Sequence, residues 1–223
     1  MNHLFALEEL LDRRVSCRGF TPKAVPEALL RRIAAAAQRT ATWCNSQPWQ
    51  LVITRGQATE DFRKALYEHA LSGEKGATDY PFPREYRGVY LERRRETGFQ
   101  LYDAVGISRA DRAARERQTL QNFRLFEAPH VAIITSDEAL GVYGAVDCGA
   151  YVANFLLAAE AAGLGTIPQA ALAHYSAFIR NHFGIGDDRR IVCGISFGYA
   201  DPDHPANMVR TRRASVDDAV IFL

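Results

Sequence analysis

The chain has 223 residues, of which 48% are hydrophobic and 24% are charged. At this length roughly 70% of the unfolded surface can be buried, which is enough for one domain with a full core. The formal net charge of +1 and the mixed charge pattern favour a solvated surface over nucleic-acid binding. The four cysteines form no CxxC pair, so we expect neither a metal site nor a disulfide framework.

The first third of the chain predicts three helices and a strand. Leucines at helical spacing predict an amphipathic helix over residues 3–13, and this start lacks the pattern of a signal peptide. Pro26 and Glu27 begin a second helix, because proline is favoured at a first helical position. A mixed β-branched run predicts a strand over residues 50–54, and a third helix is expected at 58–71.

The middle of the chain contains a long irregular segment. Residues 73–90 are rich in glycine, proline and aromatics, and a long loop in a compact domain is usually functional or mobile. Charged helices are predicted at 91–104 and 111–126. A strand over residues 131–135 begins after Pro129.

The last third is dominated by an apolar helix over residues 144–162. Because this helix is apolar almost all round, we expect it to be buried on most faces and to end at Gly163. Its longest apolar run, 151–159, is broken by Asn154 and is too short to span a bilayer, so a soluble cytoplasmic protein is predicted. A short segment at 165–167, a helix at 174–183 and a strand at 191–199 follow. Helices that separate strands predict an α/β or α+β layer architecture around one sheet.

The turn from Thr42 to Gln50 contains two tryptophans, two hydroxyl side chains and the amides of Asn45 and Gln47. Amide donors and acceptors beside flat apolar rings suit a planar heterocycle such as a flavin. The same amides can instead cap the turn. Trp49 fits ordinary core packing, and Cys44 fits a small buried side chain better than a nucleophile.

Two basic segments are candidates for binding a phosphate. Arg14, Ser16 and Arg18 share one short loop, and two guanidiniums with a hydroxyl can hold a phosphate by charge-assisted hydrogen bonds. Alternatively, the arginines interact with the dipole at a helix C-terminus. Arg210 to Arg213 form the second segment, which can equally be a solvated charge run. Neither GxGxxG nor GxxxxGK[ST] occurs, so a Rossmann or P-loop site is not supported.

Taken together, these segments resemble the FMN-dependent nitroreductase family. The matching segments are Arg14–Phe20, Asn45–Trp49, Gly163–Pro168, and Gly194–Tyr199 with the basic segment that ends at Arg213. The resemblance covers nearly the whole chain except about residues 72–112. It implies an α+β fold with three layers, α/β/α, a central mixed and mainly antiparallel sheet, and an intertwined homodimer. It also implies one domain over residues 1–223 with a helical lid at about 72–112.

The resemblance places the FMN phosphate on Arg14 and Ser16, with Val15 between them, and on Arg213. Arg18 matches a basic residue beside the pyrimidine edge of the ring, and Arg124 matches a second cation near the ring. Thr211 stands where the family often has lysine, so Arg210 or Arg212 would supply that charge.

The remaining implied contacts come from two further segments. Thr42, Trp43 and Asn45 match a segment that reaches the flavin bound mainly by the other subunit. The implied contacts at the end of the Gly163 segment are Pro168, Gln169, Ala170 and Ala171. There, backbone N–H groups of the two alanines would approach flavin N5. The family often has an acidic residue and a glycine at the alanine positions, so no acidic side chain can act there.

The implied activity is ping-pong hydride transfer from NADH or NADPH, through FMN, to a nitroaromatic or quinone acceptor. No catalytic side chain and no metal are required, because the flavin carries the chemistry. A non-catalytic flavin-binding module and a flavin-fragmenting or dehalogenating relative are the alternatives. The aromatics of the lid either pack a flat substrate or simply pack the insertion; they are Tyr80, Phe82, Tyr86, Tyr90 and Phe99.

Overall fold

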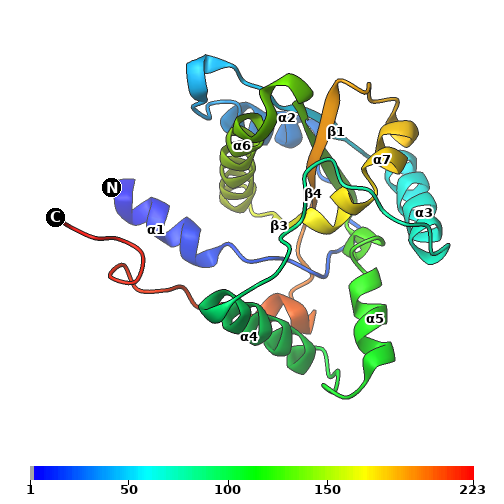
Figure 1. Cartoon of the computed structure of the whole chain (residues 1–223), viewed down its shortest axis with the longest axis vertical. Helices are drawn as coiled ribbons and strands as arrows, with labels where there is room; N and C mark the ends of the chain where they lie inside the picture. Colours follow the sequence, from blue (N-terminus) through cyan, green and yellow to red (C-terminus); the bar gives the residue numbers. More distant parts are fainter. Residues whose placement is uncertain (1–2) are drawn as a thin grey trace.

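The computed structural model describes residues 3–223, and a four-stranded sheet lies at its centre (Figure 1). The strands are β1 (Gln50–Ile53), β2 (His130–Asp137), β3 (Gly165–Gln169) and β4 (Arg189–Gly198). Their order is β1-β2-β4-β3, and each neighbouring pair is antiparallel. Parallel pairing near the sheet is limited, in the described residues, to single bridges such as Ser16 with Thr166.

Helices cover both faces of the sheet. One layer contains α2 (Glu27–Ala37) and α6 (Gly141–Ala161), and the other contains α3 (Gln57–Leu71) and α7 (Ser176–Phe183). Successive side chains of a strand point to opposite faces, so Ala132 and Ile134 of β2 pack in the first layer. Val131 and Ile133 pack in the second layer. The predicted three-layer α+β architecture with a mainly antiparallel sheet is confirmed.

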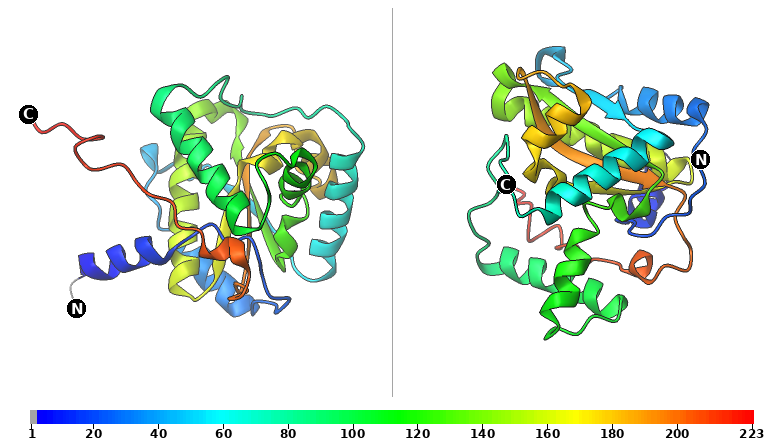
Figure 2. Two further views of the ribbon diagram at one scale, coloured as in Figure 1. Left: turned by 90° about the horizontal axis from the view of Figure 1, so that it is seen from below. Right: turned by 90° about the vertical axis from the view of Figure 1, so that its right-hand side faces the viewer.

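Three helices and the C-terminal segment lie outside these layers. The helices are α1 (His3–Arg13), α4 (Gly88–Ala104) and α5 (Arg112–Leu120). Figure 2 shows α1 and the C-terminal segment projecting from the same side of the body. Ile221 and Phe222 of that segment are 83% and 82% exposed, so its apolar end has no cover within the described chain.

Short 3-10 turns connect several elements. They are η1 (Trp43–Asn45), η2 (Leu125–Glu127), η3 (Glu138–Leu140), η4 (Ala170–His174) and η5 (Pro205–Met208). The helix predicted to reach residue 126 ends at Leu120. Leu125, Phe126 and Glu127 have φ values of 57°, 50° and 60°, which a right-handed helix cannot accommodate. Two further elements are longer than predicted, since α4 begins at Gly88 and β3 ends at Gln169.

The prediction that the apolar helix is buried on most faces is wrong for the single chain. Val142, Tyr143 and Val146 of α6 are 71%, 64% and 60% exposed. The opposite face of α6 packs in the layer with α2. By length and composition alone, the stretch Glu138–Ala161, which contains an 18-residue window with a mean hydropathy of 1.3, could cross a membrane. The apolar run at 151–159, on which the sequence prediction relied, is therefore only part of a longer apolar helix.

A buried histidine joins β2 to the segment before α2. The Nε2 atom of His130 accepts a hydrogen bond from Val25 N at 3.0 Å, and its Nδ1 atom lies 3.0 Å from Thr54 O. These partners require a neutral ring with its proton on Nδ1. Burial lowers the pKa of His130 below its usual 6.5.

The stability of the fold is expected to decrease as the pH falls below about 6.5. In that range the unfolded chain takes up a proton on His130 that the folded chain resists, so the free energy of unfolding falls with decreasing pH. Thermal unfolding followed between pH 8 and pH 5 measures this slope. His130→Gln cannot take up the proton and should flatten the slope, so equal slopes for the two proteins would contradict the role of His130.

Candidate functional site

The loop that contains Arg14, Ser16 and Arg18 runs beside β3. Ser16 pairs with Thr166 in a parallel bridge, and Cys17 N donates a hydrogen bond to Thr166 O at 2.9 Å. A Cβ on Gly165 would lie 2.8 Å from Cys17 Sγ, so the close approach of loop and strand requires glycine. The sequence therefore holds this basic loop against the edge of the sheet.

Asn207 fixes the other side of the same loop. Its Oδ1 atom accepts a hydrogen bond from Arg18 N at 2.7 Å. Its Nδ2 atom donates to Gly19 O and to Asp201 O, each at 2.9 Å. No sequence motif identifies Asn207, because its partners are up to 189 positions away.

The positive charge of Arg213 acts on Arg14 in this loop. The pKa of Arg14 is lowered by burial and then by the positive charge of Arg213, while Glu160 acts in the opposite direction. Glu160 itself pairs with Arg13 at 3.3 Å. Among the described residues no carboxylate lies in salt-bridge contact with Arg14. A guanidinium that lies in the field of a second positive charge and has no directly paired acid is suited to bind an anion.

Arg18 is largely withdrawn from solvent. Burial lowers its pKa, and its guanidinium donates to Ser16 O at 3.2 Å. Arg18 lines a cavity of about 200 Å³ together with Gln118 and Gln121 of the α5 region and Phe126 of η2. The cavity therefore places the loop next to the segment that carries Arg124.

Arg124 lies directly before the left-handed turn η2. Its Nε atom donates to Glu127 Oε1 at 2.6 Å, and its guanidinium lies 5.5 Å from the centre of the Tyr67 ring. Buried Arg63 clamps the turn, since it donates to Arg124 O and to Ala128 O. Backbone strain of this kind persists only where surrounding contacts over-determine it. Sequence reasoning missed Arg63, because its partners are 61 and 65 positions away.

Exposed and buried residues alternate at the end of β3. Pro168 and Ala170 are exposed and Ala171 is half-buried. Gln169 is buried, and both ends of its side-chain amide are hydrogen-bonded within the protein. The side-chain amide of Gln169 is therefore not free to bind a ligand.

The turn η1 and its flanks lie apart from this group. Trp43 is exposed, and its ring meets the ring of Tyr143 edge-on at 4.7 Å. Thr42 Oγ1 and Asn45 Oδ1 accept hydrogen bonds from Gln47, at 3.2 and 3.1 Å. The amides of Asn45 and Gln47 thus cap the turn.

Two other predictions concern this turn. Trp49 is buried against Tyr151, with ring centres 4.8 Å apart, which confirms its place in the core. The prediction that Cys44 is buried is wrong. Cys44 is exposed at a φ of 52°, because a left-handed turn swings its side chain outward.

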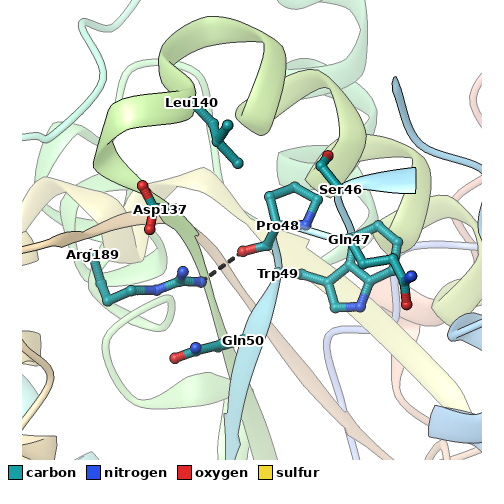
Figure 3. Close-up of a pocket in the computed structure, with 8 residues that line it drawn as sticks. All are labelled: Ser46, Gln47, Pro48, Trp49, Gln50, Asp137, Leu140 and Arg189. Atoms are coloured by element: carbon teal, nitrogen blue, oxygen red, sulfur yellow. Dashed lines mark hydrogen bonds between the residues drawn. The ribbon is translucent and has the colours of Figure 1, made fainter. Parts of the chain in front are cut away.

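A groove of about 420 Å³ lies where the turn meets β1 (Figure 3). Arg189, buried at its edge, donates to Pro48 O at 2.7 Å and to Thr135 O at 2.9 Å. These bonds use Arg189 to hold the start of β1. Arg189 on the edge of the groove thus serves to hold the turn in place.

The predicted site residues form two groups within one chain. Arg14, Val15, Ser16 and Arg18 lie with Arg213, the end of β3 and the Arg124 segment. In Figure 1 the segment with Thr42, Trp43 and Asn45 is the light-blue turn near the top, and the chain after α1 runs lower down. A single chain therefore does not bring all of these residues to one place.

The family model for the nitroreductase family matches residues 11–199. The chain belongs to the nitroreductase family. This nitroreductase is 34% identical to nitroreductase NfnB of Mycolicibacterium smegmatis over 219 residues, 97% of this chain and 92% of NfnB. It is 30% identical to the chloronitrobenzene nitroreductase of Comamonas testosteroni over 220 residues, 97% of this chain and 96% of that protein.

A solved structure extends the likeness to the fold. The FMN-dependent nitroreductase NfnB from Mycobacterium smegmatis, crystallised in complex with NADPH, superimposes with a TM-score of 0.93. The two sequences are 32% identical, and the superposition covers 100% of both chains. The predicted nitroreductase fold is thus confirmed.

Proposed function

We propose that this protein is an FMN-dependent oxidoreductase that uses NADPH or NADH to reduce nitroaromatic or quinone acceptors. The observation that carries the proposal is the half-buried Arg14 on the loop beside β3, which feels the positive charge of Arg213 and has no carboxylate in salt-bridge contact among the described residues. Support also comes from relatives, of which one is described as FMN-dependent and was crystallised with NADPH.

The residues present fit FMN. Arg14, Arg213 and the Ser16 hydroxyl would hold its phosphate, and backbone N–H groups of the exposed Ala170 and the half-buried Ala171 would donate to the ring. The chemistry that FMN supplies when bound is acceptance of hydride from the nicotinamide and its delivery to the second substrate. Arg18 and Arg124 would stabilise the negative charge that develops on the pyrimidine side of the ring. Protons can come from water, so the reaction does not require an acidic side chain at the positions of Ala170 and Ala171.

A homodimer completes this site. Trp43, Tyr143 and Val146 form an exposed apolar surface, and Trp43 contacts Tyr143 directly. Exposed apolar patches of this kind mark interaction sites. A second copy that covers this surface would bring Thr42, Trp43 and Asn45 to the FMN of its partner. The exposed apolar end of the C-terminal segment supports an intertwined arrangement.

Residues 72–112 would form a lid on one domain that spans residues 1–223. Asp79 anchors the start of this segment, since it pairs with Arg180 and accepts a hydrogen bond from Ile191 N at 2.8 Å. Several lid aromatics already have partners in the protein: Tyr80 donates to Gly141 O, Phe82 stacks on His174, and Tyr86 and Phe99 lie under Arg94 and Arg109. Tyr90 on α4 is exposed and is the aromatic best placed to meet an acceptor.

A cytoplasmic location fits the same activity. All four cysteines are free thiols, as expected in a reducing compartment. The membrane-length helix α6 packs one face in the core of the sheet layer, and the dimer would cover its exposed face.

The purified protein should be yellow with bound FMN. NADPH or NADH should bleach the flavin absorbance under anaerobic conditions, and a nitroarene should restore it with loss of the nitro group. Bound FMN that no nicotinamide reduces would instead indicate a non-catalytic flavin-binding module. Product analysis after aerobic turnover separates the reductase from a flavin-fragmenting or dehalogenating enzyme.

A further inference from the structure

Gln169 joins three elements through one buried amide. The residue is 2% exposed, and its Oε1 atom accepts a hydrogen bond from Ser196 Oγ of β4 at 2.5 Å. Its Nε2 atom donates to Asn122 O at 2.9 Å and lies 3.3 Å from Asn122 Oδ1. Both ends of the amide are therefore used, one toward the sheet and one toward the segment after α5.

Asn122 begins the segment that carries Arg124. Its own amide donates to Thr119 O at 2.9 Å, which closes the C-terminal end of α5. From the other side, Arg63 of α3 donates to Arg124 O at 3.1 Å. The segment from Asn122 to Arg124 is thus held between β3 and α3, and Gln169 provides its hydrogen bonds to β3.

We propose that Gln169 is a positioning residue that fixes the distance between the end of β3 and Arg124. The inference rests on the proposed function, because Ala170 N–H and the Arg124 guanidinium are the groups expected at two edges of FMN. Donors stabilise developing charge best when they are held in place before the reaction. Gln169 is hydrogen-bonded both to β4 and to the Asn122 segment. It can therefore fix the distance between Ala170 N–H and the Arg124 guanidinium.

The two ends of the amide can be tested separately. Gln169→Met has a similar volume and removes both sets of hydrogen bonds. Ser196→Ala removes only the bond to β4 and leaves the bond to Asn122, so it is the matched control. Both variants lose buried hydrogen bonds and should lower the stability of the fold. Only Gln169→Met should release the Asn122 segment.

In the FMN-loaded protein, the midpoint potential of the flavin is the measurement that distinguishes the variants. Gln169→Met should weaken binding of reduced FMN relative to oxidised FMN by roughly tenfold, which is about 30 mV more negative for a two-electron couple. Ser196→Ala should change this ratio less than about threefold, roughly 14 mV. Equal potentials for the two variants would overturn the proposal.

In the FMN-free protein, amide hydrogen exchange over residues 121–128 provides an independent test. Exchange there should be faster in Gln169→Met than in Ser196→Ala, and equal protection in the two variants would overturn the positioning role. A protein that binds no FMN would refute the proposed function, yet this exchange measurement would still decide the role of Gln169. If Gln169→Met does not fold, Gln169→Glu keeps an acceptor for Ser196, loses the donor to Asn122 and should show the same faster exchange.

Discussion

Arg14→Ala should weaken FMN binding by roughly tenfold to a hundredfold. A hydrogen bond to a charged group contributes about 1.5–3 kcal/mol, and each 1.4 kcal/mol is tenfold in affinity. Arg14 has no carboxylate in salt-bridge contact among the described residues. Replacing Arg14 with alanine therefore does not deprive an acidic side chain of its partner. Titration of the FMN-free protein with FMN, followed by quenching of flavin fluorescence, measures the change.

The matched control for Arg14 is Arg31→Ala, which removes the same charge from α2. Arg31 is exposed and pairs with Glu27 on its own helix, at 2.6 Å. An exposed pair of this kind contributes little to stability. FMN affinity should stay within about threefold of the parent protein, since the overall charge effect is screened at physiological salt. If Arg14→Ala and Arg31→Ala bind FMN equally well, Arg14 does not hold the phosphate.

If the protein is the proposed homodimer, Val146→Glu should convert it to monomers and remove most of the bound FMN. Val146 is 60% exposed on the apolar face of α6, so the single chain should tolerate a glutamate there. In a dimer interface the same carboxylate would lose its water without gaining a partner, which costs several kcal/mol. Because Trp43 and Asn45 would belong to the site of the other subunit, FMN should be lost together with dimerisation. Light scattering and the flavin-to-protein absorbance ratio measure the two effects.

Leu71→Glu is the control for that substitution. Leu71 is 55% exposed at the end of α3, in the opposite layer of the fold. The change in side chain is comparable, but Leu71 lies away from the α6 surface. The variant should remain dimeric and fully loaded with FMN. A dimeric, FMN-saturated Val146→Glu protein would contradict the proposed interface.

Local patterns predicted the helices and strands well where they depend on nearby residues. Apolar spacing, with Pro26 at the start, located α2 from Glu27 to Ala37, and the β-branched run located β1. The left-handed turn η2 was missed, because Leu, Phe and Glu give no sign of a positive φ. The apolar pattern of α6 indicated that the helix needs cover on several faces, and the resemblance implied that a second copy of the chain supplies part of that cover.

The sequence resemblance indicated the basic loop at Arg14 and a shared role with Arg213, and the positive charge of Arg213 lowers the pKa of Arg14 in the structure. It gave no indication of Asn207, Arg63 or the side chain of Gln169, which hold the backbone around the loop. The hydrogen bonds that tie these three side chains to the basic loop and to the Arg124 segment join residues 47 to 189 positions apart. Such contacts leave no periodic pattern in a single sequence.

The left-handed turn at η2 also affects how the protein would respond to selection for heat resistance. Glu127 has a φ of 60°, a conformation that costs a residue other than glycine about 1–2 kcal/mol. Selection for stability alone would therefore favour glycine at this position. The same change would remove the carboxylate that holds Arg124 at 2.6 Å. At position 127, glycine would thus favour thermal stability, whereas glutamate holds the Arg124 guanidinium in place.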